Sequence, residues 1–157
     1  MIFQSPTLGK LDMNQVVTDL LDYVSSDTNF PYKLIVGSDS QTRDGVTCFV
    51  TAIIIHRIGK GARYYFTRRY DRHLTSLRQR IFFETSLSLD IADRLVHCLA
   101  EKGQEELKVE IHLDVGTHGE TKELVRDIIG MVVGSGFDAH IKPNACGATK
   151  VADRYTK

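Results

Sequence analysis

The sequence contains no tryptophan and only three cysteines, Cys48, Cys98 and Cys146. The cysteines are widely spaced and odd in number, and none belongs to a CxxC or Cys/His pattern. A disulfide framework or a zinc-binding motif is therefore not expected. Isolated cysteines of this kind are typically reduced thiols, which predicts a cytoplasmic protein.

Long hydrophobic runs and a targeting segment are also missing. The chain begins Met-Ile-Phe-Gln-Ser-Pro, without the basic residues and apolar run of a signal peptide. Its longest apolar stretch, around residues 52–55, is far shorter than the roughly 20 residues that a helix needs to cross a bilayer. We therefore expect no association with a membrane.

The chain has no excess of charge of either sign. Lysine and arginine together number 20, as do aspartate and glutamate, so the formal net charge is zero. A neutral protein attracts nucleic acid or an anionic membrane only through a local patch. The chain has 157 residues, of which 42% are hydrophobic, and we expect residues 1–157 to form one globular domain with its own core.

Hydrophobic periodicity predicts four helices and five strands. The helices are expected over residues 13–24, 75–102, 117–133 and 145–156, and the strands over 33–40, 46–57, 62–70, 108–115 and 137–141. Glycine-containing turns at 43–45 and 58–61 separate the first three strands. A capping box at 117–120 is expected to open the third helix, and Asn144 to cap the last.

This order of elements predicts an α/β fold. Three consecutive strands joined by tight turns form an antiparallel meander, and the helix between the last two strands makes those two parallel. We expect a mixed five-stranded sheet flanked by helices. Residues 33–157 would form its core, with residues 1–30 as an N-terminal helical extension.

Two carboxylates follow strands that we expect to be neighbours. Asp39 lies at the end of the first predicted strand and Asp114 near the end of the fourth. Ligands of open α/β sheets bind outside the carboxyl ends of the strands. If these strands are adjacent and parallel, the two carboxylates share one edge and begin a metal site. Alternatively, Asp39 caps a turn and Asp114 caps the loop at residues 116–119.

Two further carboxylates lie on predicted helices. Glu84 falls on the apolar stripe of the second helix, where a charged side chain needs a partner. Asp153 lies on the last helix, whose small residues Ala145 to Ala148 allow a close approach to the sheet. Alternatively, Glu84 pairs with Arg80 one turn earlier, and Asp153 is a solvated helix residue. Four converging carboxylates would suit Mg²⁺ or Mn²⁺, because these hard cations prefer oxygen ligands.

A basic segment runs from Arg63 to Arg80, with six arginines against a single aspartate. Aromatic residues are interleaved with them: Tyr64, Tyr65, Phe66 and Tyr70. Arginine beside aromatic rings is typical of surfaces that pair with phosphates and stack on bases. Alternatively, the charges mark an edge strand that is protected from aggregation.

The sequence resembles the ribonuclease H-like superfamily, and within it the YkuK-like family of bacterial proteins of unassigned function. The resemblance is carried by Val-Gly-Ser-Asp-Ser-Gln at 36–41, His-Leu-Asp-Val-Gly at 112–116, Lys-Pro-Asn-Ala at 142–145 and residues 148–157. It covers the chain from about residue 33 and implies carboxylate ligands at Asp39, Glu84, Asp114 and Asp153. Classical members carry a histidine in a mobile loop before the last carboxylate, whereas residues 141–151 here contain none.

These observations predict a nuclease that depends on Mg²⁺ or Mn²⁺, with two ions held by Asp39, Glu84, Asp114 and Asp153 as catalytic ligands. The expected partner is nucleic acid, with RNA or an RNA/DNA hybrid favoured. Substrate contacts are expected from Ser40, Gln41, Arg68, Arg69, Arg72, Lys142, Asn144 and Lys150. Two other hypotheses remain open: a non-catalytic nucleic-acid-binding module or scaffold, and a metal-dependent phosphatase that acts on small esters.

Overall fold

The computed structural model describes residues 1–74, 76–116, 119, 121–142 and 147–156. Its strands are β1 (Phe3–Ser5), β2 (Gly9–Leu11), β3 (Tyr32–Arg43), β4 (Val46–Arg57), β5 (Ala62–Asp71), β6 (Val109–His112) and β7 (Asp138–His140). Its helices are α1 (Met13–Ser26), α2 (Leu77–Glu101), α3 (Val125–Gly134) and α4 (Gly147–Tyr155). None of the helices in these ranges is both long and apolar enough to cross a membrane.

The strands form one mixed sheet in the order β2-β1-β5-β4-β3-β6-β7. Strands β3, β4 and β5 make an antiparallel meander, and β6 joins β3 in parallel, with β7 parallel to β6. The α/β class, the meander and the two parallel strands are confirmed.

The predicted strand number is wrong by two, because the N-terminal extension begins with the β1–β2 hairpin. This hairpin joins the edge of β5 through the pair Gln4↔Phe66. Its strands have three residues each, too few to show the alternation from which a strand is recognised in a sequence.

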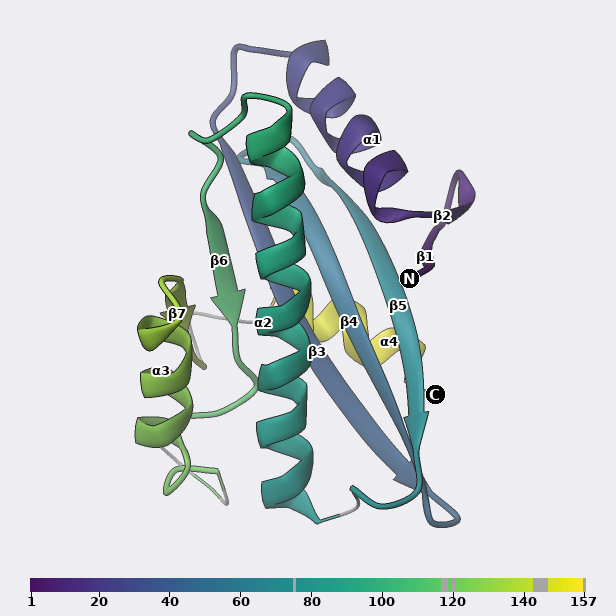
Figure 1. Ribbon diagram of the computed structural model, residues 1–157, viewed down its shortest axis with the longest axis vertical. Coiled ribbons are helices and arrows are strands. Elements are labelled where there is room, and N and C mark those ends of the chain that lie inside the picture. Colours follow the sequence, from purple (N-terminus) through teal and green to yellow (C-terminus); the bar gives the residue numbers. More distant parts are fainter. Residues whose placement is uncertain (75, 117–118, 120, 143–146, 157) are drawn as a thin grey trace.

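The helices cover both faces of the sheet. Helices α1, α2 and α3 lie over one face, where the main hydrophobic core is packed, and α4 lies on the other (Figure 1). Side chains alternate along β3, so Leu34 and Val36 enter the main core while Ile35 packs against Ala148 of α4. Asp39 and Ser40 therefore belong to opposite faces of the sheet.

Gly37 lets α4 approach the sheet closely. A Cβ atom at this position would lie 2.7 Å from the Cβ of Ala148, well inside ordinary contact distance. Ala148 and Ala152 are fully buried against β3 and β4. The small residues at this interface bring the backbone of α4, and with it Asp153, against the sheet.

Several predicted boundaries shift, and two of these shifts matter for the site. The turn after β3 has positive φ angles at Asp44 and Gly45 (52° and 77°), as in the tight turns that match the twist of a hairpin. Strand β3 consequently continues to Arg43, and Asp39 lies inside the strand, paired with Val50, rather than at its end. Asp39 therefore does not cap a turn. Strand β6 ends early, at His112, so Asp114 follows it in a loop.

The predicted helix starts agree with the structure only in part. Helix α2 begins after Ser76, which forms a capping box with Gln79. The capping box proposed at 117–120 falls largely on residues outside the described ranges, and the described helix α3 begins only at Val125, without a side-chain cap. Asn144, proposed as the cap of the last helix, also lies outside the described residues.

Candidate functional site

Asp39 and Asp114 are brought together by the parallel pairing of β3 and β6. The last pair in this ladder is Gly37↔His112. Each aspartate lies two residues beyond it, so both lie just past the same end of the β3–β6 ladder. Beyond His112, β6 no longer covers the edge of β3, and groups from both faces of the sheet can meet there. The charge on Asp114 acts on Asp39, and the side chain of Asp153 on α4 is hydrogen-bonded to Asp39.

The ionisation of Asp39 is strongly disfavoured. Burial is the largest cause, followed by the charge of Asp114 and the hydrogen bond with Asp153, and together they raise the pKa of Asp39 from 3.8 to about 7. Neighbouring like charges in a partly dehydrated place oppose one another because water screens them poorly. The cluster therefore holds more acidic groups than it can ionise alone.

Glu84 reaches the same place from the opposite face. It projects from α2, is only 8% exposed, and accepts a hydrogen bond from Ser40 Oγ at 2.5 Å. Burial is the main cause that raises its pKa to about 8, with the charges of Asp39 and Asp114 adding to it. Helical spacing suggested an ion pair between Glu84 and Arg80, but in the structure both side chains are hydrogen-bonded to Ser40. Arg80 donates from Nε to Ser40 Oγ and from Nη2 to the Ser40 carbonyl, both at 3.0 Å.

Lys142 supplies a positive charge to the cluster. Its Nζ atom lies 2.5 Å from Asp114 Oδ1, and its backbone N–H donates to the Val115 carbonyl at 3.0 Å. The ion pair with Asp114 is the main cause that raises the pKa of Lys142, and the charges of Asp39 and Glu84 contribute. Asp114 is therefore paired with a cation, and the alternative that it caps the loop at 116–119 involves residues outside the described ranges.

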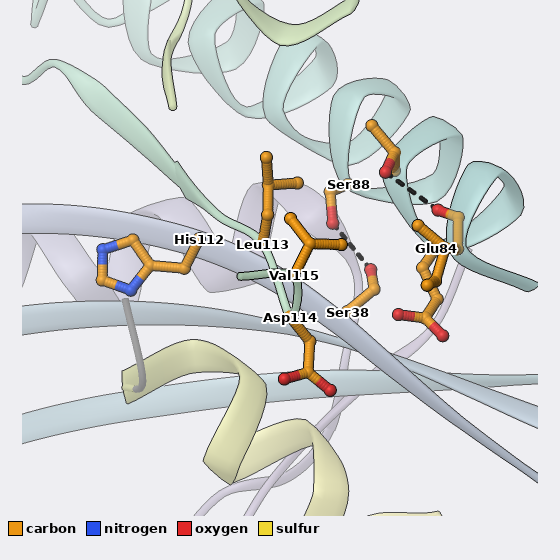
Figure 2. A pocket seen from close by; sticks show the side chains of 9 residues that line it. Ser38, Glu84, Ser88, His112, Leu113, Asp114 and Val115 are labelled. Carbon is orange, nitrogen blue, oxygen red and sulfur yellow. Dashed lines mark hydrogen bonds between the residues drawn. The ribbon is translucent and has the colours of Figure 1, made fainter. Parts of the chain in front are cut away.

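These groups surround a cavity of about 310 Å³. Its lining combines acidic, basic and apolar side chains: Asp39, Leu77, Arg80, Ile81, Glu84, Asp114, Gly119, Thr121 and Lys142. A smaller pocket, about 10 Å³, lies behind it between β3, α2 and the end of β6. Figure 2 shows the Glu84 and Asp114 carboxylates pointing to the same side of this pocket, while the His112 ring points away from them. His112 instead faces Glu110, with 3.8 Å between its Nε2 and Glu110 Oε2.

The predicted substrate residues are distributed around this cavity. Asp39, Val50 and Arg68 are successive partners across β3, β4 and β5, so Arg68 lies on the face of Asp39, roughly 10 Å away at two strand spacings. Ser40, Phe49 and Arg69 form the next row, on the opposite face. Ser40 lies within the cluster itself, since it contacts both Glu84 and Arg80.

The other predicted substrate residues differ in their surroundings. Gln41 accepts a hydrogen bond from Thr156 Oγ1 at 3.4 Å, beside the end of α4. Arg72 and Lys150 are exposed, whereas Asn144 lies outside the described residues.

Most of the aromatic residues of the basic segment are not available to nucleic-acid bases. Tyr65 is fully buried and donates to Asp19, and Phe66 stacks on Tyr155 with 3.7 Å between ring centroids. Tyr64 is half-buried and its hydroxyl is hydrogen-bonded to that of Tyr155, whereas Tyr70 is 65% exposed. The predicted stacking surface is therefore wrong for Tyr65 and Phe66, which pack inside the protein instead.

The arginines of β5 also have structural contacts. Arg68 lies over the Phe66 ring at 5.3 Å and donates from Nε to the Tyr155 carbonyl. Arg69 lies over the Phe83 ring at 5.2 Å. These contacts hold each guanidinium in a fixed position on the surface, and they leave its remaining N–H groups for a phosphate.

The donor set suits a hard divalent cation, although the carboxylates are not arranged around one. Among the described residues, no group of three or more His, Cys, Asp and Glu side chains is placed to hold a metal ion as it stands. Asp114 is paired with Lys142 and Glu84 with Ser40. Burial and the neighbouring carboxylates raise the pKa values of Asp39 and Glu84, and oxygen ligands of this kind are those that Mg²⁺ and Mn²⁺ prefer.

Sequence analysis did not identify Arg80 as a site residue. It was considered as a partner of Glu84, four residues away on one helix face, and as the last arginine of the basic segment. The position of Arg80 beside Ser40 depends on the packing of α2 against β3, and helical spacing alone does not reveal it.

Comparisons with known proteins give two matches. The family model described as Ribonuclease H-like matches residues 15–157. The uncharacterized protein YkuK of Bacillus subtilis (strain 168) is 33% identical over an alignment of 169 residues that covers 99% of this chain and 97% of YkuK. No solved structure matches the chain.

Proposed function

The chain belongs to the YkuK-like proteins of the ribonuclease H-like family, and from that premise we propose that it is a divalent-metal-dependent nuclease. The family fold points to a role that involves nucleic acid. The observation that supports hydrolysis is the meeting of Asp39, Glu84 and Asp114 at one cavity, with Asp153 hydrogen-bonded to Asp39. These four side chains come from β3, α2, the loop after β6 and α4.

In this proposal the four carboxylates would hold two Mg²⁺ or Mn²⁺ ions. Two such ions supply a nucleophilic water and stabilise the oxygen that leaves in phosphodiester cleavage. The protein's own contribution is to place the oxygen ligands. Arg80 and Ser40 fix Glu84, and α4 presents Asp153 because Gly37 and Ala148 allow its close approach.

The cations around the cavity would bind the substrate backbone. Arg68 and Arg69 lie in the strand rows of Asp39 and Ser40, each roughly 10 Å from its row partner on β3, at two strand spacings. That distance corresponds to one or two phosphates along a single strand, since successive phosphates are several ångströms apart. Exposed Arg72 and Lys150 extend the basic surface. We propose RNA or an RNA/DNA hybrid as substrate.

A cleavage assay with defined polymers tests this proposal. The purified protein is incubated with Mn²⁺ or Mg²⁺ and end-labelled single-stranded RNA, DNA duplex or RNA/DNA hybrid, and the products are separated on a denaturing gel. We expect cleavage that EDTA stops and that Asp39→Asn reduces at least about 100-fold, as for loss of a metal ligand. Asp93→Asn, an exposed position on α2, is the matched control. Cleavage that persists in Asp39→Asn, or none by the wild type on any polymer, contradicts the proposal.

A second function is favoured by one observation, the ion pair between Lys142 and Asp114. If this ammonium permanently takes the place of a metal ion, the protein is a non-catalytic nucleic-acid-binding module. This alternative predicts binding of RNA or hybrid that weakens steeply with salt, without cleavage, and with equal affinity in wild type and Asp39→Asn. Fluorescence anisotropy at two salt concentrations distinguishes the two functions.

A further inference from the structure

Among the described residues, the Lys142 ammonium is held in the cluster by one side-chain contact, with Asp114. Its backbone is fixed, because the N–H donates to the Val115 carbonyl beyond the end of β6. Its ammonium contacts Asp114 Oδ1 at 2.5 Å, while 56% of the side chain remains exposed. A long, half-exposed side chain on a fixed backbone can leave one partner for another at little cost.

The other cation that lines the cavity is held differently. Arg80 donates two hydrogen bonds to Ser40, from Nε and Nη2, and Ser40 in turn donates to Glu84. Moving Arg80 would break this arrangement and leave Glu84 without its support. Of the two cations that line the cavity in the described structure, Lys142 is the one that can be displaced.

The surroundings of Lys142 are those in which a divalent ion would have to bind. Asp39 and Glu84 face the same cavity and already act on the Lys142 ammonium. An ion shared by Asp39 and Asp114 would come within a few ångströms of this ammonium, and two cations at that distance repel each other strongly in a partly dehydrated site. The ammonium and the ion therefore compete for Asp114.

We propose that Lys142 is a built-in competitor for the divalent cation. In the metal-free protein its ammonium neutralises Asp114, and it must release this carboxylate when an ion binds. This inference rests on the proposed metal-dependent function. The released ammonium stays tethered beside the cavity, where it can pair with a phosphate of the substrate. The ion and the polyanion would then bind cooperatively. The ion releases the ammonium for the phosphate, and the phosphate keeps the ammonium away from Asp114.

Metal titration tests the competition without relying on catalysis. Mn²⁺ binding is measured by isothermal titration calorimetry, and by the electron paramagnetic resonance signal of free Mn²⁺, for the wild type, Lys142→Gln and Lys142→Arg. We expect Lys142→Gln to bind Mn²⁺ about three- to tenfold more tightly, as for release of one competing ion pair. Lys142→Arg should stay within about twofold of the wild type, because a guanidinium also pairs with Asp114.

Lys10→Gln is the matched control, since it removes the same charge from an exposed position on β2. It should change Mn²⁺ affinity less than about twofold, as expected for a screened surface charge. A variant that merely loosened the fold would bind the ion more weakly, so tighter binding by Lys142→Gln has no structural explanation of that kind.

The outcomes separate this inference from the proposed function. Mn²⁺ binding that Asp39→Asn abolishes but that Lys142→Gln leaves unchanged or weaker overturns the competition and preserves the metal site. Equal tightening by Lys142→Gln and Lys10→Gln overturns it as well, because net charge alone would explain the effect. Absence of Mn²⁺ binding by both wild type and Lys142→Gln overturns the metal-dependent function together with the competition.

Discussion

Replacing Asp39 with asparagine should stabilise the metal-free protein at pH 8 while it destroys the proposed activity. Asp39 shares a partly buried place with Asp114 and Asp153, and its pKa is raised to about 7. At pH 8 the wild type must ionise this group against burial and two neighbouring charges. Asparagine has nearly the same shape, carries no charge, and can donate a hydrogen bond to the Asp153 carboxylate.

The size of the effect follows from the pKa increase. A rise from 3.8 to about 7 amounts to about 4 kcal/mol of unfavourable free energy once the group is ionised in both states. Asp39 is partly exposed, so solvent screening reduces this figure, and we expect a gain of about 2–3 kcal/mol. For a chain of this length that corresponds to an increase in Tm of about 5–10 °C.

Thermal unfolding followed by circular dichroism, in buffer with EDTA, measures this gain. The difference between wild type and Asp39→Asn should fall to less than half at pH 5, because Asp39 is then largely protonated in the folded wild type. Asp93→Asn, exposed on α2, should change stability by no more than about 0.5 kcal/mol at either pH. Added Mg²⁺ should raise the Tm of the wild type more than that of the variant. An equal or lower Tm for Asp39→Asn at pH 8 would refute the reasoning.

Three further predictions concern the same cluster. The metal-free wild type should lose stability as the pH rises from about 4 through 7 and 8. The pKa values of Asp39 and Glu84 are higher in the folded than in the unfolded chain, so their contribution to the free energy of unfolding is complete below about pH 4 and is lost above it. Urea unfolding at pH 5, 7 and 9 checks this, and a stability that stays flat or rises with pH contradicts it. Ser40→Ala removes the hydroxyl between Glu84 and Arg80 and should lower the free energy of unfolding by about 1–3 kcal/mol and reduce the proposed nuclease activity. An unchanged urea midpoint would show that the hydroxyl does not contribute to stability. Gly37→Ala places a Cβ 2.7 Å from that of Ala148 and should lower the free energy of unfolding by about 1–3 kcal/mol. It should also reduce Mn²⁺ affinity, because α4 carries Asp153. Unchanged stability and affinity would mean that α4 moves away from the sheet without cost.

The central part of the fold could be predicted from local patterns. The strand 46–57 agrees in both bounds with β4, and the antiparallel meander follows from turns at glycine-containing segments. The N-terminal β1–β2 hairpin could not be predicted, because its short strands are defined by pairing with the distant edge of β5. The position of Asp39 inside β3 was missed for a related reason, since the hairpin with β4 extends both strands up to the turn.

The sequence by itself determined which residues are apolar on each face, and hence the sheet, the buried stripe of α2 and the placement of Glu84 on it. It also indicated that Asp39 and Asp114 come from two strands that are neighbours in the sheet. Only the tertiary structure decided what these carboxylates meet. The pairing of Asp114 with Lys142, the link from Glu84 through Ser40 to Arg80, and the burial of Tyr65 and Phe66 depend on contacts between distant segments. Periodicity shows which way a side chain points, but the charge state of a group depends on the solvent and charges around it in the folded chain.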